Sequence, residues 1–232
     1  MKRILSSLAL VTITACASAS APPQQTTTPA TTTAPPTTTT APPPASTARN
    51  VLPDLPHWRV DYWFERFGQG DKKPEIDAAF ARKPELEPMI TEKLRRRGMP
   101  EDLIYLAMAE SGLNPAAHST AEAAGIWQLV PATARRYGLH VDDTVDERTD
   151  PEKSTDAALS YLSYLYNRFG SWYLAAAAYN TGENRVGRIL TEANGSEHGT
   201  NEDYYKVWDQ LPGETRDFVP ATVALMRLGR DR

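Results

Sequence analysis

Residues 103–112 read Leu-Ile-Tyr-Leu-Ala-Met-Ala-Glu-Ser-Gly. The apolar run predicts a buried helical segment, and Glu110 stands at its end. Burial disfavours the charged form of a carboxyl group and a helix C-terminus disfavours negative charge further, so both should raise the pKa of Glu110. A carboxylic acid that keeps its proton near neutral pH can serve as a general acid. The alternative is that Glu110 faces water where the helix ends.

Helical periodicity continues on both sides of that stretch. In residues 150–170, apolar residues recur at three- and four-residue intervals, with Asp150 as cap and Gly170 as stop. Weaker patterns lie near residues 55–67, 84–97, 101–111, 131–137, 172–180, 201–210 and 215–229. We find no run of strand alternation, and we expect Pro220 to kink or bound the last helix. The sequence predicts an all-α domain with a cleft between helical groups.

Three short polar motifs follow one another along this helical region. They are Glu110-Ser111, Gly125-Ile126-Trp127-Gln128 and Ala178-Tyr179-Asn180. In this order they resemble the family-1 lytic transglycosylases of the goose-lysozyme-like fold, particularly the membrane-bound D-type branch. The resemblance covers about residues 80 to 220, with less specific pieces at 97–101 and 211–220. It implies a lysozyme-like helical domain with a substrate cleft, and an enzyme of bacterial cell-wall peptidoglycan.

The resemblance also implies a reaction. In this family a single Glu acts first as acid and then as base, which gives both roles to Glu110. The protonated carboxyl would cleave the β-1,4 bond between N-acetylmuramic acid and N-acetylglucosamine. The carboxylate would then take the proton of the C6 hydroxyl, closing a 1,6-anhydromuramoyl end. Neither a metal nor a cofactor is implied.

Further site residues follow from matching the family's motifs residue by residue. Ser119 and Gln128 match positions that hydrogen-bond the substrate, and Tyr179 matches the tyrosine that helps orient the catalytic carboxyl. Asn180 and Glu214 are weaker matches. Structural roles stay open: Gln128 and Asn180 would satisfy backbone groups at turns, and Glu214 would start the final helix, where the helix dipole favours acidic residues.

The aromatic residues are expected mostly in the core, since aromatics at helical spacing usually pack inward. Trp127 and Tyr179 are the two whose motifs favour contact with a sugar. Trp127 stands where many soluble relatives have Met or Leu, a substitution familiar in the D-type branch.

The first residues carry a targeting pattern. Lys2 and Arg3 precede an apolar stretch too short to span a bilayer, so we expect residues 1–15 to be an export signal. Cys16, the only cysteine, follows a segment that resembles a lipobox, where bacterial lipoproteins are cleaved and acylated. The alternative is secretion with cleavage near residues 17–19. A lipid on Cys16, followed by Ala17, implies the outer membrane, facing the periplasm, in a Gram-negative source. In any other source it implies a lipid-anchored extracytoplasmic protein.

Residues 16–50 would then form a lipidated cysteine and a linker made almost only of Ala, Ser, Thr and Pro, which cannot form a core. Its reach is on the order of 30 to 100 Å. An O-glycosylated stalk is the alternative that the same composition permits. Residues 51–232 are expected to form one catalytic domain, acting as a monomer.

The net charge and the histidine content limit the classes of partner and ligand that the chain is expected to bind. Removing the positive charges of Lys2, Arg3 and Arg49 from the formal net charge of −4 leaves −7 for residues 51–232, which argues against nucleic acid. The four histidines and the cysteine show no metal-ligand spacing. The acidic run at 142–150 reads as a solvated loop and helix start. The expected partners are peptidoglycan glycan strands, with the membrane reached through the lipid anchor.

Two other functions stay open. A hydrolytic muramidase of the same fold would use a second carboxylate to activate water and would leave an ordinary reducing end. A non-catalytic peptidoglycan-binding scaffold would keep the fold without turnover. The presence of Glu110, Gln128 and Tyr179 argues against the scaffold.

Overall fold

The computed structural model describes residues 52–232, and every regular element within them is helical. The described residues contain no strand, only isolated bridges such as Ala124 with Leu129. The predicted all-α fold is confirmed. The export signal, Cys16 and the whole of the linker lie outside the described residues. In chain order the helices are α1 Trp58–Gly68, α2 Lys73–Arg96, η2 Glu101–Leu103, α3 Ile104–Ser111, α4 Pro131–Arg136, η3 Glu147–Thr149, α5 Pro151–Phe169, α6 Trp172–Thr181, α7 Glu183–Asn194, α8 Asn201–Lys206, η4 Trp208–Gln210 and α9 Gly213–Arg230.

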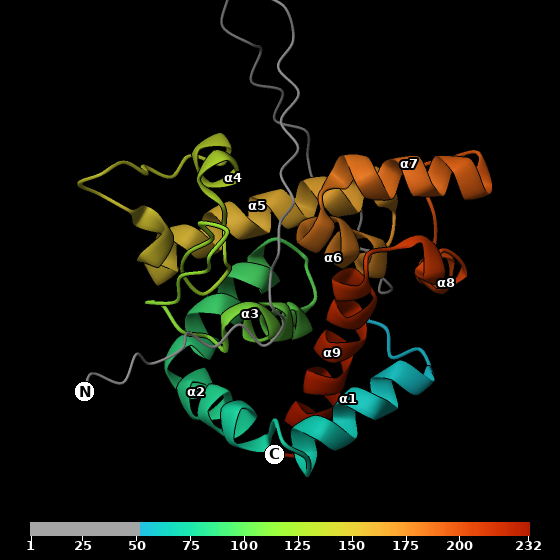
Figure 1. Cartoon of the computed structure of the whole chain (residues 1–232). Coiled ribbons are helices and arrows are strands. Elements are labelled where there is room, and N and C mark those ends of the chain that lie inside the picture. Colours follow the sequence, from blue (N-terminus) through green and yellow to red (C-terminus); the bar gives the residue numbers. More distant parts are fainter. Residues whose placement is uncertain (1–51) are drawn as a thin grey trace, which may run out of the picture.

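The helices are arranged around α3, which lies in the middle of the molecule (Figure 1). Helix α9 packs against α1, α3 and α6, and α6 also packs against α5 and α7. Every residue of α3 is buried, as its apolar sequence predicts. The end of α3, where Glu110 lies, is therefore fixed by the packing of the core rather than by a surface loop.

Helix α5 begins and ends where the sequence predicts. The side chain of Asp150 accepts a hydrogen bond from the Lys153 amide at 3.0 Å, so it caps the first turn. Gly170, in the left-handed region at φ +75°, ends the helix, and its amide donates to the Tyr166 carbonyl at 2.7 Å. The end of the acidic run is thus a helix start, as expected.

Two helices differ from the prediction. Helix α2 begins at Lys73 rather than near residue 84 and runs through Pro84 and Pro88, because burial of Ile76 and Ala79 holds its first turns against the core. Helix α7 was not among the predicted helices, since its sequence is mostly polar and carries Gly187 in its interior. Its buried residues, Val186, Gly187, Ile189 and Leu190, pack it against the core.

Pro220 does not bound the last helix, so that part of the prediction was wrong. Proline lacks the N–H that would bond the carbonyl four residues earlier, here that of Arg216. That carbonyl instead accepts the indole N–H of Trp208 at 3.0 Å and the hydroxyl of Tyr204 at 3.3 Å. Side chains from α8 and η4 thus replace the missing backbone bond, and α9 continues to Arg230.

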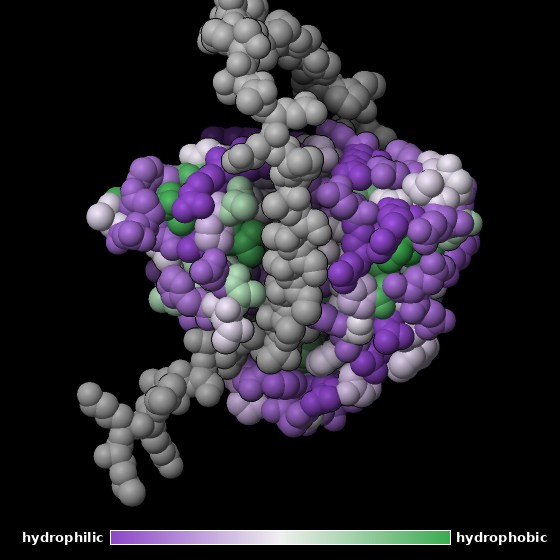
Figure 2. Space-filling view, turned by 45° about the horizontal axis from the view of Figure 1, so that its top comes forward, coloured by the Kyte–Doolittle hydropathy of each residue, from purple (hydrophilic) through white to green (hydrophobic). Residues whose placement is uncertain are grey.

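The described surface is mostly polar. On the face shown in Figure 2, hydrophilic residues dominate and apolar residues appear only in small areas. Among residues 52–232, no helix combines the length and the apolarity needed to cross a bilayer.

Candidate active site

Glu110 lies in the last turn of α3 and is buried, with 6% of its surface exposed. The helix ends one residue later, at Ser111, because Gly112 adopts φ +63° and its amide donates to the Met108 carbonyl at 2.8 Å. One carboxyl oxygen of Glu110, Oε2, is buried and has no hydrogen-bond partner among the described residues. An unpartnered buried carboxyl oxygen is costly, and it favours the neutral, protonated group.

Burial raises the pKa of Glu110 well above its ordinary value, and the negative charge of Glu214 raises it further. The direction expected from the sequence, and burial as its cause, are confirmed. The second cause was not foreseen, since Glu214 comes from the first turn of α9, more than one hundred residues along the chain. Two carboxyl groups near each other resist double ionisation, so Glu110 keeps its proton to higher pH.

The loop after α3 is tied back to the end of that helix. The Ser111 hydroxyl is buried and donates to the Ile126 carbonyl at 2.9 Å, while it accepts the Asn114 amide at 3.2 Å. Ser111 therefore joins the turn behind Glu110 to the segment that carries Gln128. Its role is to hold the backbone turn behind Glu110.

Gln128 is buried in a positive-φ conformation, at φ +47°. Its side-chain amide nitrogen donates to the carbonyls of Gly125 at 2.8 Å and Ala117 at 3.2 Å. Gln128 therefore does satisfy backbone groups at a turn, which is the structural role that the sequence left open for it. Because both donors face carbonyls, the side-chain oxygen is fixed on the opposite side, and Gln128 presents an acceptor.

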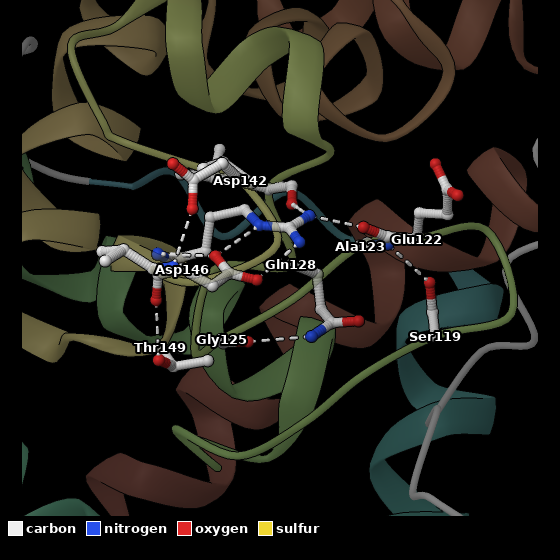
Figure 3. Close-up of polar contacts among 12 residues, drawn as sticks. Ser119, Glu122, Ala123, Gly125, Gln128, Asp142, Asp146 and Thr149 are labelled. Carbon is white, nitrogen blue, oxygen red and sulfur yellow. Dashed lines mark hydrogen bonds and ion pairs between the residues drawn. The ribbon is translucent and has the colours of Figure 1, made fainter.

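Arg148 also holds the loop that carries Gln128, from a segment that follows it in the chain. Its side chain is 8% exposed, and its guanidinium forms an ion pair with Asp146 at 2.7 Å and donates to the carbonyls of Glu122 and Leu129. Figure 3 shows this cluster, with Gln128 beside Gly125 and Asp146 on the neighbouring segment. Gly125 adopts φ +78°, and a Cβ there would lie 1.8 Å from the Arg148 carbonyl oxygen, so this position requires glycine.

Tyr179 and Trp127 meet behind the cleft. The Tyr179 hydroxyl donates to the Trp127 carbonyl at 2.7 Å. Burial raises the pKa of Tyr179 well above 10, and the nearby Glu110 raises it further, so the phenol keeps its proton. Trp127 is fully buried, and its indole N–H donates to Thr155 at 2.9 Å. Trp127 is a core residue, so the expectation that it favours sugar contact was wrong.

Asn180 connects the end of α6 to the start of α9. Its side-chain nitrogen donates to Glu214 at 3.2 Å, and its side-chain oxygen accepts the Thr215 hydroxyl at 2.8 Å. Glu214 lies in the first turn of α9, as its structural reading predicted. Asn180 thus holds in place the carboxylate that raises the pKa of Glu110.

A cleft of about 260 Å³ brings three of the predicted site residues to Glu110, namely Gln128, Tyr179 and Asn180. Ser119 and Glu214 are not among the residues that line it. The Ser119 hydroxyl accepts the amides of Ala121 at 3.2 Å and Ala123 at 3.0 Å, which is a local turn. The other lining residues are Ala123, Leu129, Val130, Thr133, Tyr161, Thr181, Gly182 and Glu183.

Glu183 is a second carboxyl group in the cleft that the sequence analysis did not identify. Burial works against its ionisation, but the Tyr161 hydroxyl donates to it at 2.8 Å and Arg136 pairs with it at 3.1 Å. The net effect lowers the pKa of Glu183. Because α7 was not predicted, nothing in the sequence placed its first residue near Glu110.

The part of the chain that the structure describes holds no group of three or more His, Cys, Asp or Glu side chains arranged to bind a metal ion. The cleft combines a carboxyl group whose pKa is raised, that of Glu110, with one whose pKa is lowered, that of Glu183. Environments that push two carboxyl pKa values apart are a feature of sites that break glycosidic bonds.

Residues 87–201 match the family model described as the transglycosylase SLT domain. Residues 87–201 of the chain therefore belong to this SLT domain family. The matched residues contain Glu110, Ser119, Gln128, Tyr179 and Asn180, while Glu214 lies beyond them.

Several curated proteins are similar to the SLT domain of this chain. The membrane-bound lytic murein transglycosylase D of Escherichia coli (strain K12) is 40% identical over 137 residues, or 59% of this chain and 29% of that protein. The soluble lytic murein transglycosylase of the same strain is 30% identical over 51% of this chain and 19% of its own length. The membrane-bound lytic murein transglycosylase C of Actinobacillus succinogenes is 32% identical over 45% and 33%. The chain thus spans a third or less of each.

The influence of Glu214 on Glu110 predicts a shift in pH dependence. In Glu214→Gln the repulsion is gone, so the pKa of Glu110 falls toward its ordinary value and the proton is lost at lower pH. We expect the alkaline limb of the activity profile to move to lower pH, measured as kcat/KM on glycan between pH 4 and pH 9. Glu202→Gln removes an exposed charge from α8 and should leave the limb unmoved. An unmoved limb in Glu214→Gln would contradict the assignment.

Proposed function

We propose that this chain is a peptidoglycan lytic transglycosylase and that Glu110 is its acid and base. The observation that carries the proposal is the buried carboxyl of Glu110, with an unpartnered oxygen and a raised pKa, opening onto the cleft. The names of the similar proteins support the same reaction and murein as the substrate.

The geometry suggests how the bond breaks. Protonated Glu110 gives its proton to the oxygen that leaves the anomeric carbon of N-acetylmuramic acid, while the muramoyl N-acetyl group assists at that carbon. The resulting carboxylate then takes the proton of the C6 hydroxyl, whose oxygen closes the 1,6-anhydro ring. Glu110 ends protonated again, no water is consumed, and one carboxyl group serves both steps.

Neighbouring residues fit supporting roles in this reaction. The fixed side-chain oxygen of Gln128 accepts a hydrogen bond from an N–H or O–H of the sugar. Tyr179, whose own proton is engaged with Trp127, has its hydroxyl oxygen free to accept the proton of the Glu110 carboxyl and so to orient it. Ser119, held in its turn, shapes the loop beside the cleft, and Asn180, which lines the cleft, holds Glu214.

One observation favours a second candidate, a hydrolytic muramidase. Glu183 is held as a carboxylate in the same cleft and would activate water in that mechanism. Digestion of purified peptidoglycan, followed by mass spectrometry of the muropeptides, separates the two reactions. We expect anhydro-ended products, and Glu183→Gln should keep that end chemistry while losing less than about tenfold in rate. Reducing-end products that disappear in Glu183→Gln would establish the hydrolase instead, and binding without products would favour a scaffold.

We also propose that the enzyme works in the cell envelope as a monomer held by lipid on Cys16, with the linker as a tether. Two of the similar proteins are named membrane-bound, which supports an envelope location. Labelling of the expressed chain with a fatty acid precursor tests the anchor, and an unlabelled chain in the culture medium would contradict it.

A further inference from the structure

A second hollow lies beside the cleft, between α7 and the segment that precedes α9. It has a volume of about 550 Å³ and is lined by Arg185, Arg188, Ile189, Glu192, Gln210, Leu211 and Pro212. The cleft is bordered by Thr181, Gly182 and Glu183, and this groove begins less than one helical turn further along α7. A hydrogen bond from Arg185 to the Thr181 hydroxyl, at 3.4 Å, joins the two.

The opposite wall of the groove also leads to the cleft. Pro212 directly precedes α9, whose first turn carries Glu214, and Glu214 is bonded to Asn180 of the cleft. The groove, defined here as the α7 groove, therefore lies next to the cleft, and each of its two walls is joined to a residue that lines the cleft.

The two arginines of the α7 groove differ from the others in the described chain. Every other arginine in residues 52–232 is held by a carboxylate or by a backbone carbonyl. Arg185 has only the long bond to Thr181, and Arg188 has no hydrogen bond or ion pair with any described residue. Three residues apart on one helix, both side chains lie on the same exposed face.

Unpaired guanidinium groups are unexpected here, because residues 51–232 carry a formal net charge of −7 and offer many carboxylates. Glu192 also lines the groove, yet no ion pair joins it to Arg188. Two neighbouring guanidinium groups without a carboxylate partner are suited to bind carboxylates, which they can hold with paired N–H donors.

We propose that the α7 groove binds the stem peptide of the glycan strand through Arg185 and Arg188. This inference rests on the proposed function, because it requires a glycan strand in the cleft. Stem peptides branch from the lactyl group of muramic acid and carry free carboxylates. A muramic acid bound in the cleft would therefore direct its stem peptide to the side of the cleft. Glu192, at the far end of the groove, suits the ammonium group of a diamino acid in the same peptide.

Calorimetric titration of the full chain in the Glu110→Gln background tests the inference without cleavage. The ligands are one glycan tetrasaccharide with stem peptides and the same tetrasaccharide after their removal. We expect the peptide-bearing ligand to bind about tenfold more tightly, and Arg185→Gln with Arg188→Gln to abolish that preference while leaving the bare glycan unchanged. The matched control is Arg95→Gln with Arg96→Gln, which removes the same charge from α2 and should keep the preference.

Several outcomes would overturn the inference. These are a preference that survives the double substitution, an equal loss for both ligands, and an equal loss in the control pair. Binding to vesicles of anionic phospholipid that depends on both arginines, with no peptide preference, would assign the groove to a membrane instead. The proposed function is tested separately by the products of the unaltered chain, so peptide-dependent binding without anhydro-ended products would contradict that function alone.

Discussion

Glu110→Gln should lower kcat on peptidoglycan by about 10³-fold or more, because the variant has no proton to deliver and no carboxylate to take one back. Gln preserves the size of the side chain, so binding of the glycan strand should change little. Release of soluble anhydro-ended fragments measures the rate, and co-sedimentation with insoluble peptidoglycan measures binding. Glu101→Gln, at an exposed position just before α3, serves as the matched control.

The same substitution has a second expected effect, on stability. The pKa of Glu110 is raised in the folded protein, so its contribution to stability is fully present below its ordinary value of 4.5 and is lost as the pH rises through the raised value. A neutral Gln at position 110 has no proton to lose, so it makes no such pH-dependent contribution. The free energy of unfolding of Glu110→Gln should therefore improve, relative to the unaltered chain, as the pH rises.

Urea unfolding at a series of pH values between 4 and 9 measures that difference. A difference that stays constant with pH would show that Glu110 titrates normally. Retained activity in Glu110→Gln would show that another group is the general acid. Glu183 is the carboxyl in the cleft that would then be tested.

The helices that the sequence predicted are those in which local signals agree with packing. In α5, the cap at Asp150, the apolar spacing and the stop at Gly170 all indicate the same segment. Helix α7 could not be predicted in this way, because its polar residues and Gly187 give only a weak local signal for a helix. Its stability comes from packing on α6. The prediction for Pro220 was wrong for a related reason, because the groups that donate to the Arg216 carbonyl come from other helices.

Chemistry was easier to predict than geometry in the cleft. A carboxyl group at the end of an apolar run is unusual in any sequence, so Glu110 could be found from local context. Glu183 could not, because its place depends on how α7 packs against α6 and on bonds from Tyr161 and Arg136. The effect of Glu214 on Glu110 is likewise a long-range electrostatic contact that no spacing rule contains.

Arg148→Met should destabilise the protein by about 3 kcal/mol, because it breaks a largely buried ion pair and removes the guanidinium donor from the carbonyls of Glu122 and Leu129. The variant should also lower kcat/KM by about 10²-fold at temperatures where it stays folded, since the freed loop carries Gln128. Arg135→Met is the matched control. The Arg135 guanidinium also donates to a backbone carbonyl, that of Val141, but does not hold the Gln128 loop.

The pH dependence of stability separates the ion pair from simple packing. Arg148 lowers the pKa of Asp146, so the stability from this pair is present above the ordinary value of 3.8 and is lost as the pH falls through the lowered value. That loss at acid pH should be smaller in Arg148→Met, as measured by urea unfolding at pH 2 to 6. An unchanged acid limb would mean that Asp146 has another partner.

Gly125→Ala tests the position of the loop by an independent route. The added Cβ collides with the Arg148 carbonyl oxygen and the backbone conformation is unfavourable for alanine, so the loop must move although Arg148 keeps its charge. If both variants lose activity while Arg135→Met retains it, the common cause is the displaced Gln128 loop. If Gly125→Ala is fully active, the loop tolerates displacement, and the effect of Arg148 is on stability alone. The loop that carries Gln128 is placed by Ser111 from α3 and by Arg148 from the segment before α5, so the geometry of the cleft depends on contacts outside it.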